Sequence, residues 1–193
     1  EQPELTTTML GKEFLNQLDA LEKLSVLLKK KIYQKKEWKI IVKDHYRQTS
    51  YMRGKLFFKR LEKLENVFVA KTDIQSEKII ELSKLIATVS GTIVWESLKK
   101  QKKSCYFGQP WYSFFKNSMN IDRQTTYQKI SEFLEQNFDL KQNELDFDYL
   151  KKKLSIGDVN EFYINTKDYD YKKNAENIVK NLKNLLQSKY VEW

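Results

Sequence analysis

The sequence predicts a mostly α-helical protein. Only 5 of its 193 residues are glycine and 2 are proline, so the chain is poor in the residues that β-rich folds use for their many turns. Lys, Glu, Leu and Gln, which favour helices, are frequent. Hydrophobic residues make up 40% of the chain and aromatic residues 13%, which is typical of a folded protein with a real core. Apolar residues also recur at helical spacing along much of the chain.

The first predicted domain, residues 1–52, carries a long amphipathic helix from about residue 12 to residue 32. Apolar residues recur there at steps of three and four, which places them on one side of a helix. These residues are Phe14, Leu18, Leu21, Leu24, Leu27, Leu28 and Ile32. A compact apolar run follows at 38–42 (WKIIV), and its period alone leaves a short helix and a strand equally open.

The second predicted domain, residues 53–103, reads as three short amphipathic helices in tandem. Ser76 is a good N-cap for the second helix and Ser90 for the third, and residues 87–89 form the tight turn between them. Such an order is typical of a helix-turn-helix arrangement. The buried faces would consist of Leu61, Leu64, Val67 and Phe68, then Ile79, Leu82, Leu85 and Ile86, and finally Val94, Trp95 and Leu98.

The third predicted domain, residues 104–193, opens with an aromatic-rich stretch and continues as helices. Six aromatic residues lie within residues 104–115 (SCYFGQPWYSFF), together with a glycine and a proline. Helical periods follow over about 127–134 and 145–154, and a final helix is expected over about 174–189. These helices, with the N-terminal one, are expected to pack around the three-helix unit.

Positive charge is concentrated in the first half of the chain. The net charge is +9 overall, made up of +3 over residues 1–52, +6 over 53–103 and zero over 104–193. A local excess of this kind indicates a surface for nucleic acid or another polyanion. Solubility and a lysine-rich composition would explain scattered lysines, but they explain the neutral C-terminal half less well.

Residues 56–103 resemble the homeodomain family. A Leu-Glu-x-x-Phe pattern of the family's first helix occurs as Leu64 to Phe68, and the third-helix tryptophan followed by a basic run occurs as Trp95 and residues 99–103. The resemblance implies a three-helix fold that binds duplex DNA, with a basic arm ahead of the first helix. The DNA contacts that it implies are Arg53, Lys55, Ser97, Lys99, Lys100, Gln101, Lys102 and Lys103.

Three positions depart from the family. The turn before Trp95 is one residue shorter, Glu96 stands where a core aromatic is usual, and Leu98 replaces the asparagine that reads an adenine edge. Loss of that asparagine removes a bidentate base contact, so we expect DNA binding with little sequence preference.

The chain as a whole resembles the homeobox-like accessory subunits of ciliate DNA N6-adenine methyltransferase complexes. The resemblance implies a non-catalytic nuclear subunit that binds duplex DNA and contacts a catalytic methyltransferase chain and other subunits. Two alternatives stay open: a protein scaffold that docks partners through the aromatic stretch, and an RNA-binding module that stacks bases on exposed rings beside lysines. Exposure of Trp111 and Tyr112 would separate a docking role from a core role.

Catalytic and metal chemistry find little support in the sequence. His45 is the only histidine and Cys105 the only cysteine, too few for a histidine-based catalytic set or a four-ligand zinc site. The five glycines are far apart, so there is no phosphate-binding glycine loop. We therefore predict no enzyme activity, no cofactor and no metal. The sequence also carries no apolar run long enough for a membrane span, and its first residues lack the basic-then-apolar pattern of a signal peptide; we therefore expect a reducing compartment.

Overall fold

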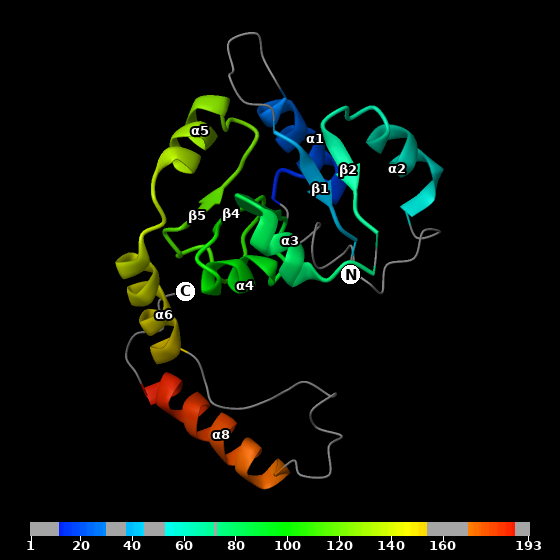
Figure 1. The fold of residues 1–193 in the computed structure, drawn as a ribbon. Coiled ribbons are helices and arrows are strands. Elements are labelled where there is room, and N and C mark those ends of the chain that lie inside the picture. Colours follow the sequence, from blue (N-terminus) through cyan, green and yellow to red (C-terminus); the bar gives the residue numbers. More distant parts are fainter. Residues whose placement is uncertain (1–11, 30–37, 45–52, 72, 154–169, 188–193) are drawn as a thin grey trace. The chain divides into compact units, whose positions relative to one another are not determined.

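The computed structural model describes residues 12–29, 38–44, 53–71, 73–153 and 170–187. Within these residues the chain has seven helices and five strands, and the strands form two small parallel sheets (Figure 1). The fold is therefore mixed α/β, and the prediction of a mostly α-helical protein was wrong. Two units are distinguished, Glu1–Asp146 and Phe147–Trp193, and each is considered by itself.

The first sheet pairs β1 (Ile40–Val42) with β2 (Val67–Val69). The two strands are parallel, with Ile41 opposite Phe68. Helix α2 (Gly54–Leu61) lies in the connection between them, as parallel strands require a crossover. The β-branched residues of both strands suit a pleated surface. Of the two structures left open for residues 38–42, a helix or a strand, the observed one is a strand over Ile40–Val42.

The second sheet has the order β3-β4-β5, with all neighbours parallel. Its strands are β3 (Leu85–Thr88), β4 (Lys103–Tyr106) and β5 (Ser118–Asn120). Helix α3 (Ser76–Leu82) precedes β3, and helix α4 (Ile93–Lys99) connects β3 to β4. All four residues of the central strand β4 are buried.

The three predicted helices of residues 53–103 do not form a homeodomain-like unit. Leu64, Phe68, Leu82 and Trp95 would have to share one core, yet the Phe68 side chain is 48% exposed and that of Leu82 80% exposed. Residues 85–88, which were predicted to end the second helix and begin the turn after it, form strand β3. Each of its residues pairs with a residue of β4 eighteen positions further on, and local periodicity does not reveal pairing at that distance.

Helix α1 (Gln17–Leu28) supplies one side of the main core. The Asn16 side chain caps it by accepting a hydrogen bond from the Asp19 N–H (3.0 Å), as an N-cap should. Phe14 just before α1 also belongs to the cluster, and the other members come from the second sheet, the segments that follow its strands, and α5. The buried residues of the core cluster are Phe14, Ala20, Leu24, Leu27, Leu28, Val89, Cys105, Phe107, Ile121 and Ile130.

Cys105 lies in the middle of β4 and is fully buried. Burial raises the pKa of its thiol, because the interior disfavours the thiolate. The protonated thiol is unreactive, so this cysteine acts as a small core residue.

The C-terminal helices agree with the periodicity of the sequence. Helix α5 (Tyr127–Glu135) is capped by Thr126, and helix α6 (Leu140–Lys153) follows. In the first unit, the Lys116 N–H donates to the Asp146 carboxylate (2.8 Å), which fastens the middle of α6 to the segment just before β5. The final helix of the described chain, α8 (Tyr171–Gln187), belongs to the second unit.

Candidate nucleic-acid interface

Lys100 and Lys102, two of the predicted DNA contacts, are used inside the fold. Lys100 Nζ lies 3.0 Å from a carboxylate oxygen of Glu81, and Lys102 Nζ donates to the backbone oxygen of the same residue (2.8 Å). Glu81 belongs to α3, so both lysines tie the end of α4 to that helix. Both ammonium groups therefore already have partners within the protein.

Lys103 is buried as the first residue of β4. Its Nζ donates to the backbone oxygens of Phe133 and Gln136 and lies 4.7 Å from the centre of the Phe133 ring. A cation that meets the last carbonyls of a helix is stabilising, and here it holds the end of α5. Burial lowers the pKa of the Lys103 ammonium. Its role is structural.

Only part of the α4 segment that was predicted to meet DNA points into the protein. Ser97 is buried, and its Oγ lies 2.7 Å from the backbone oxygen of Val94 and 2.6 Å from Ser104 Oγ. Leu98, at the position of the base-reading asparagine of homeodomains, is fully buried. Lys99 and Gln101 are exposed, and Lys99 Nζ sits over the Trp95 ring at 4.7 Å. This short helix is a packing element.

Arg53 is also engaged, whereas Lys55 is open to solvent. The Arg53 guanidinium lies 2.5 Å from Asp44 Oδ1 and donates to Gln17 Oε1 (2.8 Å), and it stacks on the Phe57 ring at 4.7 Å. Lys55 is exposed in the first turn of α2. Of the eight predicted contacts, Lys55, Lys99, Lys100 and Gln101 are exposed, and of these Lys100 is paired with Glu81.

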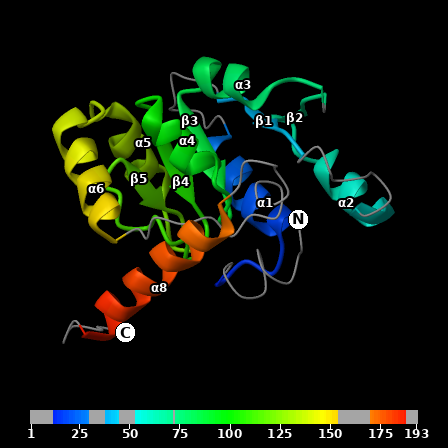
Figure 2. The same cartoon turned by 90° about the horizontal axis from the view of Figure 1, so that it is seen from below.

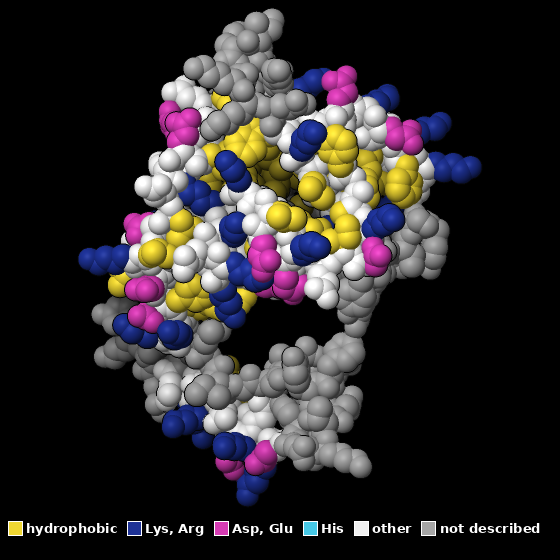
Figure 3. All heavy atoms as spheres, viewed as in Figure 1, with side chains coloured by type: hydrophobic (Ala, Val, Ile, Leu, Met, Phe, Trp, Pro, Cys, Tyr) yellow, Lys and Arg dark blue, Asp and Glu magenta, His cyan; other side chains and the backbone are white. Residues whose placement is uncertain are grey.

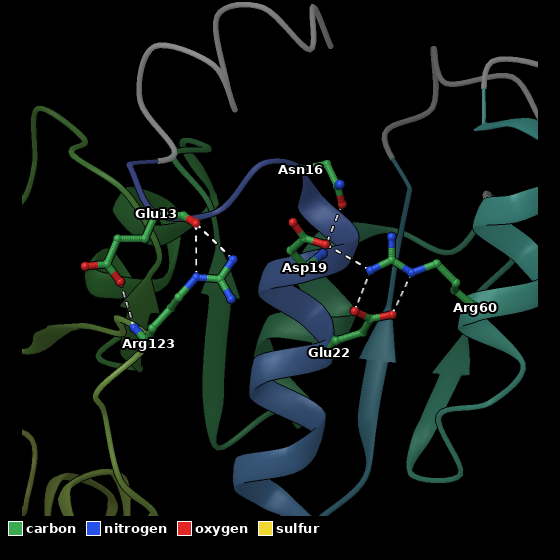
Figure 4. Close-up of polar contacts among 6 residues, drawn as sticks. All are labelled: Glu13, Asn16, Asp19, Glu22, Arg60 and Arg123. Carbon is green, nitrogen blue, oxygen red and sulfur yellow. Dashed lines mark hydrogen bonds and ion pairs between the residues drawn. The ribbon is translucent and has the colours of Figure 1, made fainter.

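Arg60 fixes α2 on α1 and so determines which side of α2 faces water (Figure 4). It donates to both carboxylate oxygens of Glu22 (2.9 and 2.6 Å) and to Asp19 Oδ1 (2.9 Å). Hydrogen bonds to Glu22 and then Asp19 raise the pKa of Arg60 above its usual range. Leu61 is buried, and the opposite side of α2 is left exposed.

The exposed side of α2, with the neighbouring strands, forms a basic surface with interspersed apolar groups. Residues 38–44 and 53–71 contain eight basic and three acidic residues, a net charge of +5. Lys39 Nζ lies 5.8 Å from the centre of the Phe68 ring, so a cation and an aromatic face adjoin here. Figure 3 shows hydrophobic and basic side chains mingled over α2 and β2. The surface, called the α2 face below, comprises Lys39, Lys55, Leu56, Phe58, Lys59, Lys63, Phe68, Val69 and Lys71.

Lys55, Lys59 and Lys63 recur at steps of four residues and are all exposed. Residues four apart lie on one side of a helix; Lys55 and Lys59 belong to α2, and Lys63 follows its end. This spacing is a signal of an exposed basic surface that the sequence already carries, although the run of lysines at 99–103 is denser.

The aromatic stretch, residues 104–115, contains both buried and exposed rings, so neither a core role nor a surface role holds for all of it. The Trp111 side chain is 53% exposed, whereas Tyr112 is fully buried and its hydroxyl donates to the Gly91 oxygen (2.8 Å). The Trp111 and Trp95 rings lie 5.7 Å apart. Tyr112 therefore belongs to the core, and Trp111 lies at the surface.

The described residues contain no group of three or more potential metal ligands. None of their helices is long and apolar enough to cross a membrane. His45 lies outside the described residues. Comparisons with protein-family models, with curated proteins and with solved structures find no match to this chain.

Proposed function

We propose that this chain is a non-catalytic subunit that holds DNA on the α2 face without reading its base sequence. The observation that carries the proposal is the +5 charge of residues 38–44 and 53–71. The exposed lysines of these residues are Lys39 beside β1, Lys55 and Lys59 on α2, and Lys63 and Lys71 in the segments after α2 and β2. Arg60 fastens the other side of α2. Basic clusters on one face are the electrostatic footprint of nucleic-acid binding.

The kind of side chain on the α2 face favours contact with phosphates. Its basic residues are lysines, which are flexible point charges rather than planar forks, and phosphate contacts position a duplex without specifying sequence. The two arginines of the region, Arg53 and Arg60, are committed to carboxylates. The α2 face therefore has no free arginine that could make a bidentate contact with a base.

Exposed aromatic rings on the α2 face also suit unpaired bases. Phe58 and Phe68 are 38% and 48% exposed and adjoin lysines, the combination that binds single strands by stacking and charge. A nucleic acid with a single-stranded segment beside a duplex would contact both the lysines and the exposed rings. RNA offers the same phosphates and bases, and so belongs among the probes.

The narrower role, an accessory subunit of a nuclear DNA adenine methyltransferase complex, remains a proposal. The homeobox-like helices that suggested it are not the fold of residues 53–103. Its present support is the basic α2 face, since a subunit that adds a DNA contact raises the effective concentration of DNA at its catalytic partner.

Removing three positive charges from the α2 face is expected to lower the affinity for DNA and to make that affinity depend less on salt concentration. The test variant replaces Lys55, Lys59 and Lys63 with glutamine. Each phosphate contact contributes about 0.9 to the slope of log affinity against log salt, so we expect the slope to fall by about two to three units. Fluorescence anisotropy of labelled duplexes of two unrelated sequences, single-stranded DNA and RNA, measured over about 50–200 mM salt, gives these slopes.

A matched variant removes the same charge from the α3–α4 side. Lys78, Lys84 and Lys99 are exposed there, and their replacement with glutamine should leave the slope close to that of the native chain. Equal losses in both variants would mean that net charge alone drives binding and would contradict a localised α2 face. Equal affinity for the two duplexes is expected, and a strong preference for one would reject sequence-independent binding.

A further inference from the structure

Among the described residues, strand β1 pairs along one edge only, with β2. Ile40 N–H donates to the Asn66 oxygen and the Val42 oxygen accepts from Ala70 N–H, both at 2.8 Å, so Ile40 and Val42 direct their backbone groups toward β2. Backbone groups alternate in direction along a strand, which turns those of Ile41 away from β2. Within the described residues, no hydrogen bond reaches the Ile41 backbone from that side.

Strand β3 likewise pairs along one edge only, with β4, in the ranges that the structure describes. The Thr88 oxygen accepts from Phe107 N–H (3.1 Å), so Thr88 and, two residues earlier, Ile86 face β4. Ala87 then points its N–H and C=O away from the second sheet. In the part of the chain that the structure describes, those groups too are without a hydrogen-bond partner.

The two unpaired edges line one cavity of about 760 Å³. Its lining contains every residue of 38–44 and of 82–93. A strand that presented a face would contribute every second residue, so consecutive residues indicate that each strand presents its edge. In Figure 2, β1 and β3 are the neighbouring strands of the two sheets, and Figure 3 shows a hollow with hydrophobic side chains between the sheets.

The two sheets run in the same direction relative to α1. At the carboxyl end of β1, Asp44 and Gln17 share the Arg53 side chain. Beyond the carboxyl end of β5, Arg123 donates to the backbone oxygen of Glu13. The start of α1 therefore lies near the carboxyl ends of strands from both sheets. The sheets are arranged as two parts of one parallel sheet, interrupted at the cavity.

We propose that this cavity binds an extended segment of a partner polypeptide, which adds a strand between β1 and β3. Only a polypeptide backbone offers alternating N–H and C=O groups on both sides, as the edges of Ile41 and Ala87 require. Addition of a strand to an exposed edge is a recurring mode of peptide recognition. Here the segment would pair on both sides at once.

The cavity walls indicate the chemistry of the segment. Leu18, Leu21 and Leu24 of α1 line one side, and Ile79 and Ile80 of α3 also contribute apolar groups. Because successive side chains of a strand point to opposite faces, the inserted strand meets α1 with every second residue, and those residues are apolar. Strands usually have about five to six residues, which is the expected length of the paired part.

Charged groups at the cavity favour an acidic flank on the partner segment. Lys39, Lys43 and Lys84 line it from the two strand walls, whereas Glu77 and Glu96 line it from α3 and α4. Asp44 is neutralised by Arg53 at 2.5 Å. The strand walls are thus basic, and an acidic residue in the inserted strand would meet lysines.

Proline at Ala87 tests the proposal without breaking the native sheet. The Ala87 N–H is unpaired, and proline is tolerated where an edge N–H is free. The Ala87→Pro chain should therefore keep its fold but lose a donor to the inserted strand. Ile86→Pro is the matched control, since it removes a hydrogen bond to β4 and should unfold more readily.

The probe is a phage-displayed library of random peptides, selected on the full native chain. We expect enriched peptides with alternating apolar residues, and a loss of at least tenfold in their affinity for Ala87→Pro. A synthetic copy of the best peptide, N-methylated at alternate amides, should bind at least tenfold more weakly. Failure to enrich any peptide, or equal binding by Ala87→Pro, would overturn the proposal.

Hydrogen exchange of the free chain distinguishes an open cavity from one already filled. The amides of Ile41 and Ala87 should exchange rapidly in the free chain and slowly once the selected peptide is bound, while those of Val42 and Thr88 stay slow throughout. Slow exchange of Ile41 and Ala87 without peptide would overturn the proposal, because another part of this chain or a second copy would then occupy the strand position.

Discussion

Replacing Leu98 with asparagine is expected to lower the free energy of unfolding by about 3–5 kcal/mol, since a buried apolar side chain is lost and an amide is buried in its place. Leu98 is fully buried in α4. In a homeodomain the same substitution would restore the base-reading asparagine on the surface of the third helix. The mixed α/β fold therefore predicts a loss of stability for this substitution, whereas a homeodomain fold predicts a stable chain that gains a base contact.

Chemical denaturation of Leu98→Asn measures this effect, with Lys99→Asn as the control. Lys99 is the next residue of the same helix and is exposed, so its replacement tests the helix propensity of asparagine without burying it. We expect the control to cost less than about 1 kcal/mol. A stable Leu98→Asn chain with new sequence preference for DNA would contradict the mixed α/β fold.

Replacing Tyr112 with alanine is expected to destabilise the protein by about 3–5 kcal/mol, the usual cost of removing a buried aromatic ring. Tyr112 is fully buried, packs edge-on against Tyr106 at 6.1 Å between ring centres, and donates to the Gly91 oxygen. It thereby joins the segment after β4 to the turn between β3 and α4. Tyr112→Phe removes the hydroxyl alone and should cost about 1 kcal/mol.

Trp111→Ala separates a core role from a surface role in the same stretch. Its side chain is 53% exposed and meets the rings of Trp95 and Tyr112, so we expect a smaller loss of stability than for Tyr112→Ala. Thermal and urea unfolding of both variants give the comparison. Equal losses would show that the two rings form one buried cluster and would contradict the division between them.

Long elements of the fold were predictable from the sequence, whereas short strands were not. The apolar period of α1 runs over three turns, and α6 and α8 are longer still, so their patterns identify helices. The strands have three or four residues each. Such short apolar runs fit a helix or a strand equally well, and the hydrogen bonds that decide between them come from distant residues.

The sign and the approximate location of the charge were predictable, but the available lysines were not. Residues 53–103 carry +6, yet their densest lysine cluster is partly consumed by Glu81 and by the carbonyls at the end of α5. Those contacts join residues about 20 to 30 positions apart. Lys55 and Lys59 on α2, and Lys63 just after it, are left available because Arg60 of α2 takes the contacts with α1.

Lysine footprinting with and without DNA tests the central claim most directly. The native chain is acetylated briefly at low salt, free or with a saturating short duplex, and the modification of each lysine is read by mass spectrometry. The proposal predicts protection of Lys55, Lys59 and Lys63, with Lys78 and Lys99 modified equally in both samples. Protection of Lys99 with unchanged Lys55, Lys59 and Lys63 would contradict the assignment of the DNA surface to the α2 face.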